Sequence, residues 1–161
     1  MKNKKIFIAC DTKSIIKVKK IIKETRTNKI KVGYKFGIEF FNSKNGRSFI
    51  SKIKNKIIFA DLKLHDIPNT CVSAIKSIRD LKINYLTIHI SSGINALKAS
   101  KKACGKIKLI GVTTLTSFDN KSVKEIGYNK NLKELVIHQA KIAAKAKLDG
   151  IVCSPHETKY L

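Results

Sequence analysis

The stretch IIFADLKLHDIPNTCVSAIKSIRDL, residues 57–81, predicts one β-strand followed by one α-helix. Residues 57–62 form a short, mainly apolar run of the length that a buried strand needs. After a polar segment that contains a proline, apolar residues recur three apart, at Val72, Ile75, Ile78 and Leu81, which indicates a helix that starts near Asn69. A strand, a polar loop and a helix together make the β/α unit of parallel α/β folds.

The same β/α unit repeats along the chain. We expect strands at Ile6–Cys10, Ile30–Phe36, Ile57–Leu62, Tyr85–Ile90, Lys108–Thr113 and Gly150–Cys153. We expect helices at residues 15–25, 49–53, 69–81, 93–103 and 132–146, and a short helical turn where Ser122 and Glu125 form a capping-box pattern. No Asn-Gly or Asp-Gly turn joins two adjacent strands, so the pattern favours a parallel sheet with helices outside it.

Two architectures fit this alternation, an open doubly wound sheet and a (β/α)8 barrel. The first predicted strand is followed by residues 11–14, DTKS, and not by the glycine-rich fingerprint of dinucleotide-binding sheets; a P-loop is also missing from the sequence. Polar residues follow several strands, namely Asp11, Lys35, Asp61, Lys63, His89, Thr116 and Ser154. In a barrel these strand ends converge on one mouth, where active sites lie, so we predict an α/β fold of the (β/α)8 TIM-barrel type.

The number of strands is two short of a closed barrel. Six strands are predicted in 161 residues, whereas complete barrels have eight and usually run to roughly 200 residues or more. We therefore expect residues 1–161 to be a single incomplete barrel domain, truncated after the sixth strand. Unpaired strand edges and bare apolar faces would leave such a chain poorly folded and nearly inactive on its own.

The chain is strongly basic, with 34 Lys and Arg residues against 11 Asp and Glu residues and a net charge of +23. Only three of the basic residues are arginines, the lysines are spread along the chain, and aromatic residues do not alternate with basic ones. This pattern is unlike a base-stacking platform, so we expect solvated lysine faces and no nucleic-acid partner. The alternative of a non-catalytic, basic nucleic-acid-binding domain stays open, and salt-dependent binding to DNA or RNA would support it.

Other classes of protein are disfavoured by what the sequence lacks. No apolar run reaches the ~18 residues of a membrane span, and the short run Ile6–Cys10 lacks the cleavage site of a secretory signal, so we expect a cytoplasmic protein with no membrane partner. The four cysteines form no C-x-x-C pair, and the four histidines form no H-x3-H pair. We therefore expect structural cysteines and no metal site.

Residues 61–66, DLKLHD, are the segment most suited to chemistry. Asp61 and Lys63 are two apart at a strand end, which places their side chains on the same face, and Asp66 follows in the loop before Pro68 begins a helix. Two carboxylates around one ammonium favour its protonated form, so Lys63 suits a proton donor and not a Schiff-base nucleophile. On spacing alone, a surface ion network explains these residues equally well.

The longer string Asp61–Thr70, DLKLHDIPNT, resembles the signature of the orotidine 5′-monophosphate decarboxylase family nearly letter for letter. Further segments resemble that family in the same order: Ala9–Asp11, Lys35–Phe41, His89–Gly93, Val112–Ser117 and Leu148–Glu157. Cys10 replaces the usual leucine of the first segment, and Ser92 stands where glycine is usual. The resemblance extends from Ile6 to Glu157.

The resemblance implies decarboxylation of orotidine 5′-monophosphate (OMP) to UMP in pyrimidine synthesis, without a metal or organic cofactor. Lys35, Asp61, Lys63 and Asp66 would form an alternating charged array in which Lys63 protonates C6 and Asp61 faces the departing carboxylate. Asp11 and Lys35 would hold ribose hydroxyls, and Thr116 would contact the pyrimidine. Asp66, Ile67 and Thr70 would come from the partner subunit of a homodimer. Lys31 is an alternative for the family lysine, but Lys35 alone is followed by the glycine and glutamate of the motif.

Two further expectations come from the resemblance. The family's phosphate-binding glutamine and glycine-arginine pair belong to segments near the last two strands, which this sequence does not contain. The sibling barrels, magnesium-dependent sugar-phosphate synthases and decarboxylases, share D-x-K-x-x-D, but their motif does not continue as Ile67-Pro68-Asn69-Thr70. Loss of activity with EDTA would identify the sibling chemistry.

Overall fold

The structure is a computed structural model that describes residues 5–161, and these residues divide into two compact units. The first unit comprises residues 5–62 together with Ser77–Leu86. The second comprises Lys63–Lys76 together with Thr87–Leu161. Strands β3 and β4 contribute residues to both units, and each unit is described separately below. The expectation of a single domain stays a prediction.

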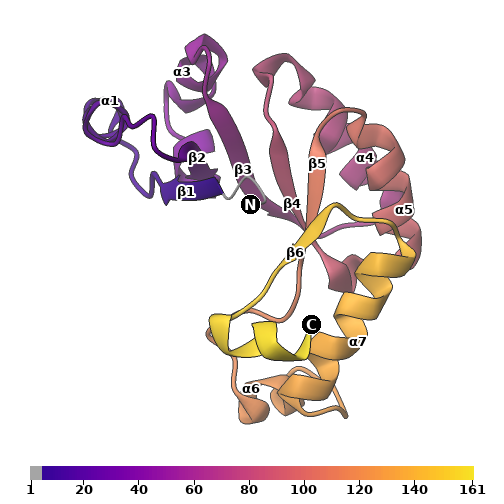
Figure 1. The fold of residues 1–161 in the computed structure, drawn as a ribbon. Coiled ribbons are helices and arrows are strands. Elements are labelled where there is room, and N and C mark those ends of the chain that lie inside the picture. The colour runs from indigo at the N-terminus through magenta and orange to yellow at the C-terminus, as the bar shows by residue number, and fades with distance from the viewer. Residues whose placement is uncertain (1–4) are drawn as a thin grey trace. The chain divides into compact units, whose positions relative to one another are not determined.

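Six strands follow one another in chain order, as Figure 1 shows by colour. They are β1 (Lys5–Ala9), β2 (Lys31–Gly37), β3 (Ile57–Leu64), β4 (Tyr85–His89), β5 (Lys108–Val112) and β6 (Gly150–Val152), in the sheet order β1-β2-β3-β4-β5-β6. The pairs β1–β2, β2–β3 and β5–β6 are parallel. All six strands lie where the sequence predicts them, although β3 continues two residues further than expected.

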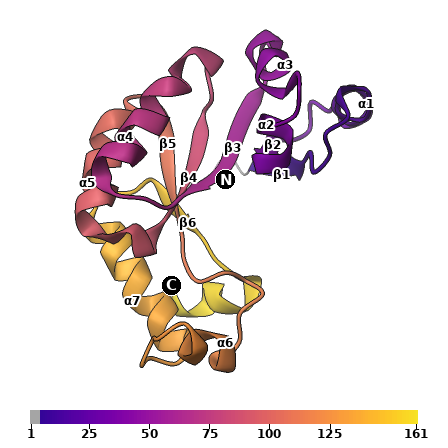
Figure 2. The same cartoon turned by 180° about the vertical axis from the view of Figure 1, so that it is seen from behind.

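The first unit packs short helices beside β1 and β2. It contains α1 (Ile15–Glu24), α2 (Ile38–Phe41), α3 (Gly46–Lys52) and the 3-10 turn η1 (Arg79–Leu81). Helix α2 contacts β2 and α3 (Figure 2). The rings of Phe36 and Phe40 are buried with centroids 4.9 Å apart, and Ile50 of α3 is buried as well. Burial of these apolar side chains is the main force that fixes β2 and its helices in place.

The second unit packs longer helices against β5 and β6. Its elements are α4 (Pro68–Ser77, of which Ser77 belongs to the first unit), η2 (Ile90–Ser92), α5 (Gly93–Cys104), α6 (Asn120–Glu125), α7 (Leu132–Lys145) and η3 (Pro155–Tyr160). Helices α5 and α7 lie side by side in both views (Figures 1 and 2). Gly111 leaves room for Ile90 of η2 and for Leu148, which follows α7, because a Cβ there would lie 2.8 Å from Ile90 Cγ1 and 2.9 Å from Leu148 Cδ1.

The start of α6 corrects one prediction from the sequence. Ser122 and Glu125 do not begin the helix as a capping box; instead Asp119 is the N-cap, and its side chain accepts a hydrogen bond from the Ser122 amide at 2.8 Å. The carboxylate of Asp119 satisfies the free amides of the first turn better than the Ser122 hydroxyl three residues later. A true capping box, formed by Asn131 and Glu134, begins α7, and the sequence analysis did not single it out.

The surface carries the excess of positive charge. None of the lysines between residues 5 and 161 is buried, which agrees with solvated lysine faces. Across the same residues, no helix combines the length and the apolar character that crossing a membrane requires.

Candidate active site

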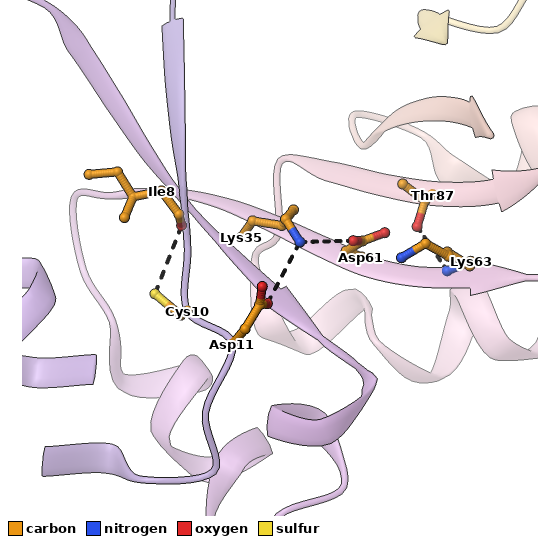
Figure 3. A network of polar contacts seen from close by, with 7 residues as sticks. All are labelled: Ile8, Cys10, Asp11, Lys35, Asp61, Lys63 and Thr87. Carbon is orange, nitrogen blue, oxygen red and sulfur yellow. Dashed lines mark hydrogen bonds and ion pairs between the residues drawn. The ribbon is translucent and has the colours of Figure 1, made fainter. Parts of the chain in front are cut away.

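The first unit gathers three of the predicted charged residues into one ion-paired cluster. Lys35 Nζ lies 3.0 Å from Asp61 Oδ2 and 3.8 Å from Asp11 Oδ1 (Figure 3). The Asp61 side chain is 11% exposed, that of Lys35 is 27% exposed and that of Asp11 is 67% exposed. The ammonium of Lys35 therefore makes a short, poorly solvated contact with one carboxylate and a longer, solvated one with the other.

The parallel strands bring these three residues together. In the β1–β2 ladder Ala9 pairs with Lys35, and in the β2–β3 ladder Gly37 pairs with Asp61, so the carboxyl ends of β1 and β2 lie beside Asp61 of β3. The amide of Cys10 continues the ladder by donating to the Lys35 carbonyl at 2.9 Å, which places Asp11 immediately beyond it. Carboxyl ends of neighbouring parallel strands lie at one edge of the sheet, as the sequence analysis expected.

Lys31, the other candidate for the family lysine, lies at the opposite end of β2. It pairs with Lys5 at the first position of the β1–β2 ladder and is exposed. Lys35 is therefore the lysine of β2 that lies beside Asp11 and Asp61.

Cys10 is buried beneath this cluster. Its Sγ contacts the Ile8 carbonyl at 3.9 Å. Burial, together with the negative charge of Asp11, raises the pKa of the Cys10 thiol to about 11, and the positive charge of Lys35 only partly offsets that rise. The thiol is therefore protonated at neutral pH and serves as a small apolar side chain under the charged residues, the structural role expected from the sequence.

The second unit contains Lys63, which is half-buried near the end of β3. Its backbone has φ 47°, in the left-handed region, and its amide donates to Thr87 Oγ1 at 2.8 Å (Figure 3). The argument that Asp61 and Lys63 share a face assumed an extended backbone at both positions. That assumption does not hold at Lys63, because a positive φ interrupts the alternation of side chains along a strand.

Two histidines lie together in the same unit. The ring centroids of His65 and His89 are 5.0 Å apart with an interplanar angle of 39°, and Ser91 Oγ lies 3.3 Å from His65 Nε2. These residues line a cavity of about 310 Å³, whose wall also includes Thr113, Thr114, Leu115, Phe118, Ile126, Tyr128 and Gln139. The Thr114 hydroxyl and the Gln139 Oε1 at its wall are 3.1 Å apart and buried, so the wall is fixed by a side-chain hydrogen bond.

The residues that the family resemblance assigns to a partner subunit lie at the start of α4. Asp66, Ile67 and Thr70 are all exposed, and Ile67 keeps 65% of its surface accessible. Asp66 Oδ1 accepts a hydrogen bond from the Ile67 amide at 2.7 Å, and the Cys71 thiol lies 3.3 Å from the Asp66 carbonyl. The loop before Pro68 is thus held by its own short-range bonds while its side chains face solvent.

Thr116 is not among the residues that line the histidine cavity. It is exposed and lines a second cavity of about 580 Å³, together with residues of α7 and η3 such as Lys133, His156 and Tyr160. Thr87, which holds the Lys63 amide, was not singled out from the sequence. A signal for it did exist, since a threonine two residues before His89 on a buried strand shares the face of that histidine.

Within residues 5–161, no group of three or more His, Cys, Asp and Glu side chains is placed to hold a metal ion. The four cysteines are free thiols; Cys10, Cys71 and Cys104 are buried, and Cys153 is half-buried.

Comparison with known proteins identifies the family. The family model described as "Orotidine 5′-phosphate decarboxylase / HUMPS family" matches residues 4–161. A protein of Wolbachia sp. subsp. Brugia malayi named orotidine 5′-phosphate decarboxylase is 41% identical over 159 residues, which are 96% of this chain and 69% of that protein. A protein of the same name from Streptococcus mutans is 36% identical, over 100% of this chain and 71% of its own length.

Solved structures agree in fold. The crystal structure of orotidine 5′-phosphate decarboxylase from Lactobacillus acidophilus has a TM-score of 0.88 and 31% identity, and the match covers 96% of this chain and 73% of that one. The α/β fold is therefore of the TIM-barrel type, with the first six β/α units present. Because a family model matches almost the entire chain, this protein belongs to the orotidine 5′-phosphate decarboxylase/HUMPS family.

Proposed function

We propose that this chain carries the chemical residues of an orotidine 5′-phosphate decarboxylase, a carbon–carbon lyase that converts OMP to UMP and carbon dioxide in cytoplasmic pyrimidine synthesis. The observation that supports it most is the contact of Lys35 Nζ with Asp61 Oδ2 at 3.0 Å, with Asp11 3.8 Å away. This cluster joins the carboxyl ends of β1 and β2 to the carboxyl half of β3, on the side where barrel enzymes carry their active sites.

In the proposed reaction the bond between C6 of the pyrimidine and its carboxylate breaks. The electron pair stays on C6, carbon dioxide leaves, and the ammonium of Lys63 donates the proton that replaces it. Asp61 faces the departing carboxylate, so its charge repels the substrate carboxylate more than the charge-delocalised transition state. Fixed charges of this kind act without reorganisation during the reaction, so the proposed mechanism uses no metal or organic cofactor.

The remaining residues bind the substrate. Asp11 and Lys35 hold ribose hydroxyls, and their solvated contact at 3.8 Å leaves the Asp11 carboxylate accessible to a hydroxyl donor. Thr116, which is exposed, contacts the pyrimidine. Contacts to the ribose and phosphate supply binding energy that orients the ring, and the charges near C6 then act mainly on the transition state.

The first experiment measures OMP turnover by the loss of OMP absorbance. Because the chain spans 69% of the Wolbachia relative, the assay uses this chain and also a chimera in which residues 5–161 replace the matching segment of that relative. Lys63→Ala should lower turnover by about two to four orders of magnitude, the usual contribution of a positioned proton donor, while UMP still binds. Lys31→Ala, which alters an exposed lysine at the far end of β2, is the matched control.

Each result of this experiment has a definite reading. Near-normal turnover in Lys63→Ala would rule out the proposed mechanism. Lys35→Ala is measured beside Lys31→Ala. If both variants lose the same activity, Lys35 is not distinguished from Lys31 as the family lysine. Abolition of activity by EDTA would indicate the magnesium-dependent chemistry of the sibling barrels instead.

We also propose a homodimer in which Asp66, Ile67 and Thr70 reach the partner's site. The support is that all three are exposed, and that Ile67 presents a large apolar side chain to solvent. Ile67→Glu should weaken the dimer at least about tenfold in sedimentation velocity, because a charge would be buried at the interface. Ile126→Glu, at an isoleucine 55% exposed, is the matched control. Equal effects of the two changes would place the interface elsewhere.

A further inference from the structure

Lys63 has an unusual backbone for its place in the fold. Four non-glycine residues among residues 5–161 have a positive φ: Asn55, Lys63, Lys82 and Lys147. Lys82 and Lys147 follow helical segments, where the left-handed conformation is common, and Asn55 lies between α3 and β3. Lys63 alone of the four lies inside a strand. A long side chain in this region is strained, and the strain persists only where the surroundings hold the backbone.

The end of β4 provides that hold. Thr87 is fully buried, and its Oγ1 accepts the hydrogen bond from the Lys63 amide at 2.8 Å (Figure 3). Two residues further along the chain from Lys63 and from Thr87, the rings of His65 and His89 meet at a tilt, with centroids 5.0 Å apart. His65 Nε2 also lies 3.3 Å from Ser91 Oγ. Thr87, His89 and Ser91 thus contact the segment that carries both Lys63 and Asp66 at two successive points.

We propose that Thr87 is a positioning residue for Lys63, and that the contact of His65 with His89 and Ser91 is a second support for the same segment. The threonine hydroxyl fixes the amide of Lys63, which sets the direction in which its side chain leaves the strand. The catalytic consequence rests on the proposed function, in which Lys63 delivers a proton to carbon. The hold on the backbone is independent of any substrate.

The effect should fall on the chemical step. A proton donor that is misplaced by about 1 Å loses much of its rate contribution, whereas substrate contacts made by other residues are unchanged. Removal of the Thr87 hydroxyl should therefore lower kcat with little change in KM, which is the pattern for an interaction used in the transition state.

The test compares three variants of the chain. Thr87→Val keeps the size and β-branching of the side chain but removes the hydrogen-bond acceptor, and Thr87→Ser restores the hydroxyl. Thr25→Val is the matched control, because the Thr25 hydroxyl makes structural hydrogen bonds to the Ile21 carbonyl and to Tyr34 Oη away from Lys63. Amide hydrogen exchange at Lys63, read by NMR, reports the hold on the backbone, and OMP turnover reports its consequence.

We expect exchange at Lys63 to become at least about tenfold faster in Thr87→Val and to stay near the wild-type rate in Thr87→Ser and Thr25→Val. In the turnover assay, Thr87→Val should lose about ten- to a hundredfold in kcat with KM within about threefold, and Thr87→Ser should recover most of the loss. If Thr87→Val does not fold, His65→Phe provides a second test, because residue 65 is exposed and the change keeps an aromatic ring beside His89 while removing the contact to Ser91. His65→Phe should lower kcat about three- to tenfold.

The outcomes separate this proposal from the proposed function. Unchanged exchange at Lys63 in folded Thr87→Val would overturn the positioning role, whatever the activity. Faster exchange with unchanged kcat would overturn its relevance to catalysis, as would unchanged kcat in His65→Phe. If exchange at Lys63 is faster in Thr87→Val but the wild-type protein itself does not turn over OMP, the hold of Thr87 on Lys63 is supported and the proposed function is contradicted.

Discussion

The two units hold their chemistry-bearing residues in different ways. In the first unit, Lys35 is placed by charge, with a carboxylate 3.0 Å from its ammonium. In the second unit, the Thr87 hydroxyl holds the backbone at Lys63, and the ring of His65 in the same segment contacts the ring of His89 at a tilt. The ion pair fixes the side-chain tip of Lys35, whereas the hydrogen bond to Thr87 fixes the backbone of Lys63.

The largest effect on stability should come from breaking the ion pair of the first unit. In Asp61→Ala, the half-buried ammonium of Lys35 keeps only one carboxylate of this cluster, the more distant and solvated Asp11. The change should therefore lower the free energy of unfolding by about 2–3 kcal/mol. Asp11→Ala removes an exposed partner and should cost less than about 1 kcal/mol. Urea unfolding at pH 7 measures both. Equal losses would mean that burial of Asp61 is not what makes its contact strong.

A second comparison uses the thiols of the two units. Cys10 is buried with a pKa of about 11, whereas Cys153 in the second unit is half-buried, and its pKa is raised by burial and by the charge of Glu157. At pH 8, iodoacetamide should modify Cys153 at least about tenfold faster than Cys10, because the thiolate is the nucleophile and access is required. Peptide mass spectrometry over time gives the two rates. Faster modification of Cys10 would show that the end of β1 opens readily.

A smaller effect is expected from Asp149 in the second unit. Burial pushes the pKa of this carboxyl upward, but hydrogen bonds from Lys101 and the Leu109 amide, with the charges of Lys101 and Lys108, outweigh it and hold the pKa below its ordinary value. A lowered pKa stabilises the fold above the ordinary value near 3.9, and the stabilisation is lost as the pH falls through the lowered pKa. Asp149→Asn should therefore cost about 1 kcal/mol at pH 7.

The same variant has a pH-dependent signature. The difference in unfolding free energy between wild type and Asp149→Asn should shrink as the pH is lowered from about 5 toward 3, because the wild-type carboxyl becomes protonated. Thermal melts across this range provide the measurement. A difference that stays constant with pH would mean that the asparagine disturbs packing and not charge.

Much of the fold could be predicted from the sequence, because the apolar residues that set its periodic patterns are also the residues that the structure buries. The run of residues 57–62 predicts β3, and the apolar stripe that includes Ile75 predicts α4. That helix ends at Ser77, four residues earlier than predicted, and Leu81 lies in the separate 3-10 turn η1. The start of α6 was placed wrongly, because Asp119 and Ser122 are both good caps and the sequence does not say which one the chain uses. The short helix α2 was missed because four residues carry too little periodicity.

The candidate site was predictable in its members but only partly in its geometry. The meeting of Lys35, Asp61 and Asp11 was expected from the strand ends, since parallel strands align them. The left-handed backbone of Lys63 was not predicted, because nothing in an isolated lysine indicates a positive φ. It depends on an acceptor 24 positions away, at Thr87, and such long-range bonds are invisible to local patterns. The catalytic roles of all these residues stay predictions.

The three bonds around Asp149 also determine which residues of β5 and β6 face each other. Strand β6 has three residues, so its ladder with β5 is short. A shift of the pairing by one position would break few backbone hydrogen bonds. Asp149 prevents that slip: its amide donates to the Leu109 carbonyl at 2.9 Å, and its carboxylate accepts from the Leu109 amide at 2.8 Å and from Lys101. Ile110 is thereby paired with Gly150. Since a one-residue slip turns every side chain of a strand to the opposite face, one carboxylate decides which side of β6 meets the core.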